Sequence, residues 1–367
     1  MSTVPAPGEQ RDFVNLAEIE EAAAEYLPLP VLDYYRGGAN DEITLRTNRQ
    51  AFERLSLRFR VLRDVAERSL ETVILGRPVA SPIFVAPMAL QRMAHPDGET
   101  ATARAAARAG TIMIASTLAT TSAEDIRRSS DGRLWFQLYI YQDREATREL
   151  VARVEAAGYE ALVLTVDTPI LGRRERDIRN GFHLPPGIVI ANLVPEGQET
   201  LPHAHGASGL AVHAAYVLDP SIGWRDIAWL RSITRLPLIL KGIVRGDDAA
   251  RAVTEGVTGV VVSNHGGRQL DTAIPTIDAL PEVVAAVGDA AEVYVDGGIR
   301  RGTDVLKSLA LGARAVLIGR PVLWGLAVDG ERGVSRVLTL LRNELELAMA
   351  LCGARTIAEI SKDLVVP

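Results

Sequence analysis

Eight short runs of apolar residues, rich in valine, isoleucine and leucine, recur along the chain from residue 83 onward. They lie at Ile83–Ala86, Ile112–Ala115, Trp135–Tyr139, Ala161–Val166, Leu238–Leu240, Val260–Val262, Val293–Val295 and Val316–Ile318. Continuous apolar runs are typical of parallel strands buried on both faces, whereas half-exposed strands alternate apolar and polar residues. The pattern therefore predicts eight buried parallel strands.

Segments with helical spacing, rich in alanine and charged residues, separate these runs, for example Glu99–Arg108, Glu145–Ala157 and Asp247–Glu255. Strands that alternate with helices form either an open doubly wound sheet or a closed barrel. Eight regular units favour closure, so we predict a (β/α)₈ TIM barrel of the α/β class. A last helical pattern, Gly333–Cys352, predicts a terminal helix that packs outside the barrel.

Two regions lie outside the repeat. Residues 13–75 precede the first strand and contain a helical pattern at Leu16–Glu25, which predicts an N-terminal cap segment or plug. Residues 169–224 are too long for an ordinary loop, so we predict a lid after the fourth strand, with about 195–210 mobile. Residues 1–12 are predicted to be a disordered tail, and residues 13–367 to form a single domain.

Composition excludes several classes of function. The 40 basic and 46 acidic side chains leave a net charge of −6, so there is no electrostatic reason to expect nucleic-acid binding. The single cysteine, Cys352, excludes an intrachain disulfide and a thiolate-rich metal site, and indicates a reducing compartment. No apolar segment is long enough to cross a bilayer, and the N-terminus lacks a secretory signal. We therefore expect a cytoplasmic enzyme with no metal and no membrane partner.

Polar residues follow the predicted strands where each one ends. In TIM barrels the active site lies at this end of the strands. The residues are Ser116, Gln137, Tyr139, Thr165, Asp167, Lys241, Ser263, His265, Arg268, Asp296, Arg300, Gly319 and Arg320. Their joint placement predicts an active site at this rim.

The loop Ser263–Asp271 carries a histidine and, three residues later, an arginine, with two glycines between them. A histidine can take a proton near neutral pH, and an arginine can grip a carboxylate with two parallel hydrogen bonds. The loop therefore predicts proton abstraction next to a carboxylate, with His265 as the base. The histidines of the predicted lid, His203, His205 and His213, are expected to face solvent.

Several neighbouring charges allow more than one interpretation. Lys241 would form an ion pair with Asp167 or Asp296, or it would act as a Schiff-base lysine. Asp167 would orient a protonated histidine or cap its own loop. Of Arg173 and Arg174, one is expected to reach the substrate and the other to be a surface charge.

The loops after the seventh and eighth strands predict a phosphate site. Gly297 and Gly298 expose backbone N–H groups, and Arg300 and Arg320 supply positive charge. Barrel enzymes often bind phosphate at this position. Barrels that bind phosphosugars and barrels that bind flavin mononucleotide share this signature.

These residues resemble those of the family of FMN-dependent (S)-2-hydroxy-acid oxidases and dehydrogenases, which includes glycolate, lactate and 4-hydroxymandelate oxidases. The resemblance runs from about Leu16 to the C-terminal helix. It rests on Asp33–Ala39, Ala86–Ala89, Phe136–Tyr139, Leu164–Pro169, Leu171–Arg174, Lys241–Gly242, Ser263–Asp271, Asp296–Gly302 and Ile318–Pro321. It implies oxidation of an (S)-2-hydroxy acid to the 2-keto acid with FMN as cofactor, O₂ being reduced to H₂O₂. A homotetramer or homo-octamer is also implied.

The resemblance further implies the role of individual residues. His265 would be the base, Asp167 would stabilise its protonated form, and Lys241 would stabilise the reduced flavin. The catalytic group would comprise His265, Asp167, Tyr139, Tyr34, Arg174, Arg268 and Lys241. The cofactor would contact Pro87, Met88, Ala89, Ser116, Gln137, Tyr139, Thr165, Lys241, Ser263, Asp296, Gly297, Gly298, Arg300, Gly319 and Arg320. The substrate would contact Tyr34, Leu118, Tyr139, Arg174, His265 and Arg268.

Three positions depart from the family pattern: Leu118, Met88, and Ile170, which stands where the family often has a basic residue. Leu118 stands where glycolate oxidases carry a tryptophan in the substrate pocket, and Met88 replaces a threonine expected beside the flavin. Because leucine is smaller than tryptophan, we expect a substrate bulkier than glycolate, such as lactate or a medium-chain or aromatic acid. The alternatives are a dehydrogenase with another electron acceptor, a phosphosugar lyase or isomerase that uses Lys241, and a flavin-binding protein without turnover.

Overall fold

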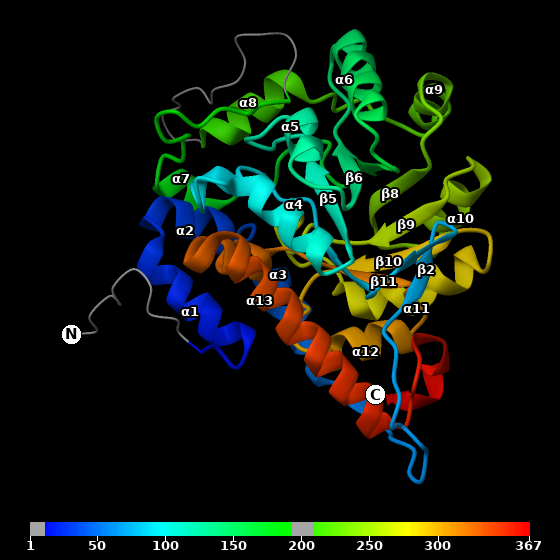
Figure 1. Cartoon of the computed structure of the whole chain (residues 1–367). Helices are drawn as coiled ribbons and strands as arrows, with labels where there is room; N and C mark the ends of the chain where they lie inside the picture. Colours follow the sequence, from blue (N-terminus) through cyan, green and yellow to red (C-terminus); the bar gives the residue numbers. More distant parts are fainter. Residues whose placement is uncertain (1–11, 193–207) are drawn as a thin grey trace.

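The computed structural model describes residues 12–192 and 208–367, and its centre is a closed barrel of eight parallel strands (Figure 1). Around the barrel the strands follow the order β10-β11-β4-β5-β6-β7-β8-β9. Their bounds are β4 Ile83–Val85, β5 Ile112–Ser116, β6 Arg133–Leu138, β7 Leu162–Thr165, β8 Leu238–Ile243, β9 Gly259–Val262, β10 Glu292–Asp296 and β11 Ala315–Ile318. Each strand overlaps one predicted apolar run, so the predicted (β/α)₈ barrel is confirmed.

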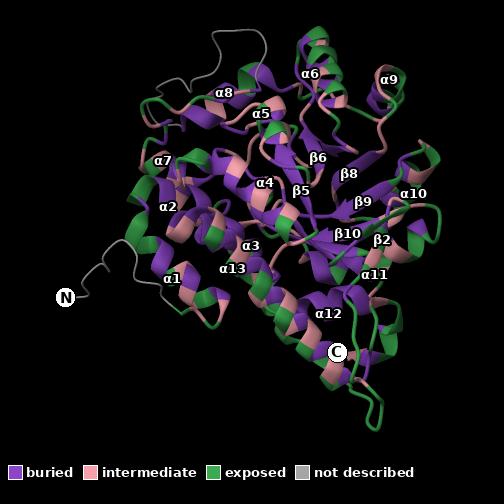
Figure 2. Ribbon diagram, viewed as in Figure 1, coloured by how far each residue is buried: buried purple, intermediate pink, exposed green. Residues whose placement is uncertain are grey.

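The strands are continuous in apolar character because both of their faces are covered. Every residue of β4, β5, β7, β9 and β11 is buried. The ribbons at the centre of the molecule are accordingly mostly purple in Figure 2. Phe84, Trp135 and Tyr294 pack against one another with ring centroids 5.6–6.1 Å apart. Aromatic rings in this arrangement fill the barrel, so it is a packed core rather than a channel.

A hairpin closes the N-terminal end of the barrel. It consists of β2 (Thr72–Ile74) and β3 (Arg77–Val79). The backbone N–H of Leu75, at its turn, donates to the carboxylate of Glu292, the first residue of β10. Residues 13–75, predicted to form a cap or plug, supply only β2 of this hairpin, because β3 follows them in the chain. The polar residues lie at the opposite rim.

Helices surround the barrel on its outside (Figure 1). They are α4 Gly98–Arg108, α5 Ala123–Arg128, α6 Arg144–Ala156, α9 Arg225–Ile233, α10 Gly246–Thr254, α11 Thr276–Val287, α12 Gly302–Ala310 and α13 Arg320–Cys352. The terminal helix predicted over Gly333–Cys352 is the second half of α13. Asp329 and Gly330 have non-helical backbone angles, so α13 is two helices joined at a kink.

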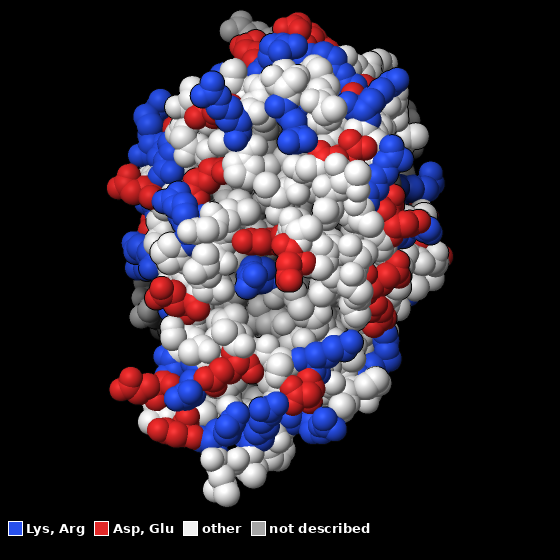
Figure 3. All heavy atoms as spheres, turned by 90° about the vertical axis from the view of Figure 1, so that its right-hand side faces the viewer, with Lys and Arg blue, Asp and Glu red and all other residues white. Residues whose placement is uncertain are grey.

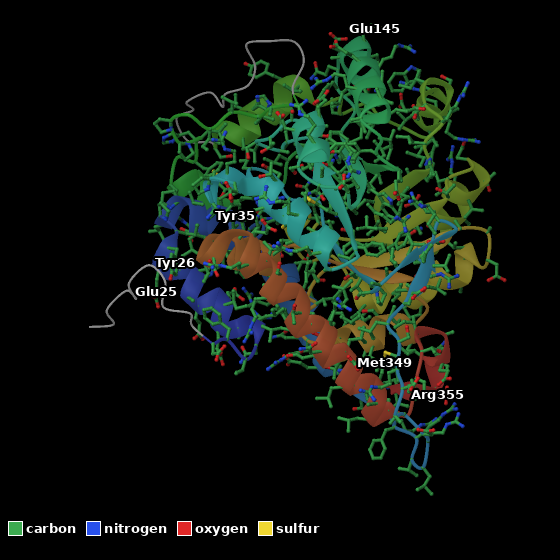
Figure 4. The ribbon with its side chains drawn as sticks, viewed as in Figure 1. Glu25, Tyr26, Tyr35, Glu145, Met349 and Arg355 are labelled. Atoms are coloured by element: carbon green, nitrogen blue, oxygen red, sulfur yellow. The ribbon has the colours of Figure 1, made fainter. Side chains whose placement is uncertain are left out.

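The N-terminal segment packs along α13 and the barrel rim. It contains α1 (Leu16–Tyr26), α2 (Leu29–Arg36) and α3 (Ile43–Glu53). Tyr35 of α2, labelled in Figure 4, packs edge-on against Trp324 of α13, with ring centroids 6.3 Å apart. The predicted N-terminal cap is thus a set of three helices.

Short elements complete the chain. β1 (Ser56–Leu57) pairs antiparallel with β12 (Val365–Val366), which joins the end of the chain to the N-terminal segment. The 3₁₀ helices are η1 Gln91–Met93, η2 Ile357–Glu359 and η3 Lys362–Leu364.

The predicted lid contains α7 (Glu175–Arg179) and α8 (Gly209–Val217). The stretch predicted to be mobile lies mostly outside the described residues, as do His203, His205 and residues 1–11 of the predicted tail. The prediction that His213 faces solvent is wrong. His213 is buried on α8 because it shares the inward face of that helix with Leu210, Ala214 and Val217.

In the part of the chain that the structure describes, no helix has both the length and the apolar character needed to cross a membrane. Figure 3 shows one face of the molecule, on which acidic and basic side chains intermingle around uncharged areas. This face therefore has no extended area of positive charge.

Candidate active site

A cavity of about 160 Å³ opens at the carboxyl ends of the barrel strands. Nineteen of the predicted site residues line it, and they come from every part of the predicted set: Tyr34, Pro87, Met88, Ala89, Ser116, Leu118, Gln137, Tyr139, Thr165, Arg174, Lys241, His265, Arg268, Asp296, Gly297, Gly298, Arg300, Gly319 and Arg320. The other two, Asp167 and Ser263, contact His265 and Lys241 from behind. The barrel therefore brings the whole predicted set together.

His265 and Asp167 form a hydrogen-bonded pair at this rim. Nδ1 of His265 lies 2.8 Å from Oδ1 of Asp167, and the Thr168 hydroxyl donates to the same carboxylate oxygen. Burial opposes ionisation of Asp167, but the charges of His265 and Lys241 outweigh it and lower the pKa of this carboxyl. An ionised carboxylate only accepts hydrogen bonds, so Nδ1 carries the proton and Nε2 is left as a base.

The electrostatic surroundings of His265 favour its neutral form. Burial lowers the pKa of its imidazole, and the positive charges of Lys241 and Arg174 act in the same direction. The carboxylate of Asp167 opposes these effects and would stabilise the imidazolium once a proton has been taken. This combination suits a general base that works near neutral pH.

Lys241 sits at the end of β8 in a buried ion pair. Its Nζ lies 2.9 Å from Oδ2 of Asp296 and donates to the Ser263 hydroxyl at 2.8 Å. Burial lowers the pKa of Lys241, but the carboxylates of Asp296 and Asp167 raise it by more than burial lowers it. The pKa of Lys241 is therefore above its ordinary value. Of the two ion-pair partners predicted for Lys241, the structure places Asp296 in contact.

Gly242 explains how Asp167 fits beside this pair. Its φ is +112°, and a Cβ atom there would lie only 2.6 Å from the Cβ of Asp167. The pairing of β8 with β9 shifts register between Lys241 and Ile243 at the same point. The glycine after Lys241 therefore lets the Asp167 loop approach β8 closely.

Two arginines face the same cavity, Arg174, which is buried, and Arg268, which is partly buried. Arg174 is 6% exposed, and its Nε donates to the Arg268 carbonyl at 3.5 Å. Burial and the neighbouring Arg268 charge lower the pKa of Arg174 to about 10. Two guanidinium groups that repel each other in a buried site would bind an anion strongly. Arg173 is 67% exposed, so Arg174 is the member of this pair that reaches the cavity.

Tyr34 closes this end of the cavity. Its ring stacks on Phe182 with centroids 4.4 Å apart, and the Arg268 guanidinium lies over the ring, 5.0 Å from its centroid. Arg268 also donates to the Tyr34 and Gly37 carbonyls at 2.6 and 3.0 Å. The anion-binding end is thus built from the N-terminal segment, the lid and the His265 loop together.

The polar groups at the centre of the cavity fit the flat heterocycle of a flavin. Gln137 accepts hydrogen bonds from the Ser116 hydroxyl and the Thr117 backbone through Oε1. Its Nε2 and the Oδ1 of Asp296 are buried and have no partner among the described residues. A ring edge that carries both donors and acceptors satisfies such groups.

The far end of the cavity fits a phosphate. Arg300 lines the cavity, and its buried Nε has no partner among the described residues. Burial lowers the pKa of Arg300 to about 10. Arg320 differs, because its guanidinium donates to the carbonyls of Tyr35, Gly37 and Gly266. Of these two arginines, Arg300 therefore has the N–H group that is available to bind an anion.

Sequence reasoning did not assign several apolar residues that line the cavity to the site, among them Tyr35, Leu171 and Leu210. Leu171 directly precedes the Gly172–Arg174 motif, so its position in the chain could have identified it. Leu210 is the second residue of α8, near the end of the long insertion, and no pattern in the sequence connects that helix to the rim. No cluster of three or more His, Cys, Asp or Glu that could hold a metal occurs within residues 12–192 and 208–367.

Comparison with known proteins agrees with this geometry. Residues 23–367 match the model of a family described as FMN-dependent dehydrogenase. The chain is 57% identical over 351 residues to the L-lactate oxidase of Nostoc sp., with 95% of this chain and 96% of that protein covered. It is 52% identical over 356 residues to 2-hydroxyacid oxidase 1 of Homo sapiens, with 96% of each chain covered.

A solved structure has the same architecture. The crystal structure of mandelate oxidase with (S)-4-hydroxymandelic acid superposes with a TM-score of 0.92 at 47% identity. The match covers 95% of this chain and 98% of that one. The predicted resemblance is confirmed over nearly the whole chain.

Proposed function

This chain belongs to the FMN-dependent dehydrogenase family, and we propose that it oxidises an (S)-2-hydroxy acid with an apolar side chain to the 2-keto acid. O₂ is the electron acceptor and H₂O₂ the second product. The names of the relatives, which include an L-lactate oxidase and a 2-hydroxyacid oxidase, support this reaction class. FMN, when bound, accepts the two electrons of the oxidation.

The observation that carries the proposal is a base and a pair of arginines, one of them buried, in one cavity. Arg174 and Arg268 hold the substrate carboxylate, and the Tyr34 hydroxyl adds a hydrogen bond to it. His265 accepts the proton that leaves the substrate, and Asp167 stabilises the resulting imidazolium. Such a base, placed within reach of the bound substrate, contributes about 10²- to 10⁴-fold to the rate.

Two further residues complete the proposed site. Tyr139 lines the cavity, and burial raises the pKa of its hydroxyl, which therefore stays protonated and can donate to the substrate hydroxyl. Lys241 is held protonated by Asp296, and its charge stabilises the reduced cofactor. A lysine held protonated is a poor Schiff-base nucleophile, which weighs against the lyase alternative.

The substrate side chain is proposed to face an apolar wall of Leu118, Leu171 and Leu210, all of which line the cavity. Side chains of this kind favour a methyl, alkyl or aryl group over the bare hydrogen of glycolate, because each buried methylene stabilises binding. Lactate and larger acids are therefore the proposed substrates.

The test is to mix the purified holoenzyme anaerobically with both enantiomers of lactate, mandelate, 2-hydroxyoctanoate and glycolate while recording the visible flavin band. We expect bleaching by S enantiomers, with lactate or a larger acid giving the highest kcat/KM and H₂O₂ forming when air is admitted. Bleaching without rapid reoxidation in air would establish a dehydrogenase with another acceptor. A flavin that none of these acids reduces would contradict the proposal.

We also propose a cytoplasmic homo-oligomer, a tetramer or an octamer. Cys352 is buried and free, which suits a reducing compartment. Exposed apolar side chains, Phe59, Val61 and Leu62 on one loop and Leu347 and Leu351 on α13, support association of subunits. Sedimentation of the purified protein as a monomer would contradict the oligomer.

A further inference from the structure

Arg176 lies on α7, two residues after Arg174, and binds two carboxylates of the N-terminal segment. Its Nε and Nη2 donate to the two carboxylate oxygens of Glu42 at 2.8 and 3.0 Å. Its Nη1 donates to Oδ1 of Asp33 at 3.0 Å. A planar guanidinium that meets one carboxylate with two bonds and a second with one fixes its partners in orientation as well as in distance.

Both carboxylates belong to the part of the chain that presents Tyr34. Asp33 directly precedes Tyr34 on α2, and Glu42 also accepts a hydrogen bond from the Gly38 backbone at 3.0 Å. The side-chain amide of Asn180, just after α7, donates to the other oxygen of Asp33 at 2.9 Å. This cluster, Asp33, Glu42, Arg176 and Asn180, will be called the α2–α7 clamp.

The α2–α7 clamp joins two segments that each supply a group to the cavity. One segment carries Tyr34, and the other begins directly after Arg174. A backbone hydrogen bond from Asn40 to the Arg173 carbonyl, 2.9 Å long, runs beside the clamp. No member of the clamp lines the cavity itself, so any effect on the substrate passes through Tyr34 and Arg174.

The side chains of the α2–α7 clamp are partly shielded from solvent, which strengthens their electrostatic interactions. The side chains of Asp33 and Glu42 are 16% and 18% exposed, and that of Arg176 is 37% exposed. Burial opposes ionisation of Glu42, but its hydrogen bonds with Arg176 and Gly38 outweigh this and lower its pKa. Without Arg176, two half-buried carboxylates would lose the positive charge that they share, and we expect α7 to be held less firmly to α2.

We propose that Arg176 is a positioning residue for carboxylate binding: it fixes Arg174 relative to Tyr34 without touching the substrate. The inference rests on the proposed function, because it assigns Arg174 and Tyr34 to the carboxylate of a 2-hydroxy acid. Loss of Arg176 should therefore weaken binding of carboxylate ligands and leave FMN binding at the other end of the cavity intact.

The test compares Arg176→Ala with Arg179→Ala in the holoenzyme. Arg179 lies on the same helix, is 71% exposed and pairs with Glu175 at the surface, so it is the matched control. For Arg176→Ala we expect KM for the best hydroxy acid to rise roughly tenfold and kcat to fall less than about threefold. Both changes are smaller than the roughly 10²-fold loss of rate that a 1 Å displacement of a reacting group can cause. Arg176→Lys should recover part of the loss, and Glu42→Gln should reproduce part of it.

A readout without turnover separates this inference from the proposed function. Pyruvate binding, followed by its perturbation of the visible flavin spectrum, should weaken by the same factor as KM rises in Arg176→Ala. If wild-type protein binds pyruvate but oxidises no 2-hydroxy acid, the proposed function fails while the clamp can still be tested.

Two results would overturn the inference. One is an unchanged KM and pyruvate Kd in Arg176→Ala. The other is a parallel loss of FMN affinity, kcat and KM that Arg176→Lys does not relieve, because that pattern marks a merely structural residue. If Arg176→Ala does not fold, Arg176→Lys and Glu42→Gln carry the same test, and either must show the KM-selective loss.

Discussion

Nδ1 of His265 lies 2.8 Å from Oδ1 of Asp167, although the two residues are 98 positions apart and follow different strands. The bond sets both the tautomer and the orientation of the imidazole, so that Nε2 is left free for the proton of the substrate. In the proposed reaction, Asp167 is therefore a second residue on which proton transfer depends.

Replacing Asp167 with asparagine should lower the rate of substrate oxidation by about 10²-fold or more while FMN remains bound. The amide can keep the hydrogen bond but supplies no negative charge to stabilise the imidazolium. Stopped-flow reduction of the flavin under anaerobic conditions measures the rate, and the visible spectrum of the resting variant is the control. A reduction rate within twofold of wild type would contradict the assigned role of Asp167.

The pH dependence should reflect the same pair. Burial lowers the pKa of His265 below its ordinary value of 6.5, and the base must be neutral to act. In wild type, kcat/KM should therefore rise with pH and level off with an apparent pKa below 6.5. Asp167 opposes the downward shift, so in Asp167→Asn the rise should move to still lower pH. A rise centred above pH 6.5 in wild type would argue against His265 as the titrating base.

Arg300→Ala should weaken FMN binding. A charge-assisted hydrogen bond contributes about 1.5–3 kcal/mol, which corresponds to a roughly 10- to 100-fold higher Kd for FMN. Arg301→Ala is the matched control, because Arg301 is its chain neighbour but is 54% exposed and pairs with Glu344. Fluorescence titration of the apoprotein with FMN measures both. Equal FMN affinities of the two variants would exclude Arg300 from the phosphate site.

The strands of the barrel and the residues at its rim could be predicted from the sequence. The strands were predictable because burial on both faces makes each of them a continuous apolar run. The residues of the active-site rim could be predicted from the barrel topology. Closure of the barrel brings residues such as Lys241 and His265 to one end, whatever their distance along the chain. Such predictions depend only on local pattern and topology.

The parts that were not predictable depend on tertiary packing. Nothing in the local sequence distinguishes Arg173 from Arg174, and only the close approach of the lid to the His265 loop buries the second of them. Leu210 and the burial of His213 both depend on where α8 packs, far along the chain from the strands beneath it. The partner of Lys241 was equally a matter of side-chain geometry between strands.

Gly172→Ala should raise KM more than it lowers FMN affinity. A Cβ at this position would lie 2.5 Å from the Arg268 carbonyl and 2.6 Å from the Gln269 backbone, which cannot move aside as a flexible side chain can. The lid segment that carries Arg174 would be displaced from the His265 loop. We expect KM for the hydroxy acid to rise by about tenfold or more, given the sensitivity of bound geometry to 1 Å shifts.

The control for Gly172→Ala is Gly223→Ala. Gly223 has no atom within 4 Å of an added Cβ, and its φ is not in the left-handed region. This variant should have wild-type KM. A normal KM in Gly172→Ala as well would show that the two loops need not approach so closely for substrate to bind.

The size of residue 118 should decide which acid is preferred. Leu118 lines the cavity together with Leu171 and Leu210, so a tryptophan at position 118 would fill the space proposed for the substrate side chain. Leu118→Trp should lower kcat/KM for lactate and larger acids relative to glycolate by at least about tenfold. A single methylene in an apolar pocket already changes the ratio of kcat/KM values by about this factor or more. Leu118→Ala, the matched variant that enlarges the pocket, should shift preference toward mandelate and 2-hydroxyoctanoate.

The ratios of kcat/KM values for both variants come from steady-state peroxide formation with the four acids. If neither variant changes the order of preference, the side chain of the substrate does not contact Leu118, and the apolar wall must be assigned elsewhere in the cavity.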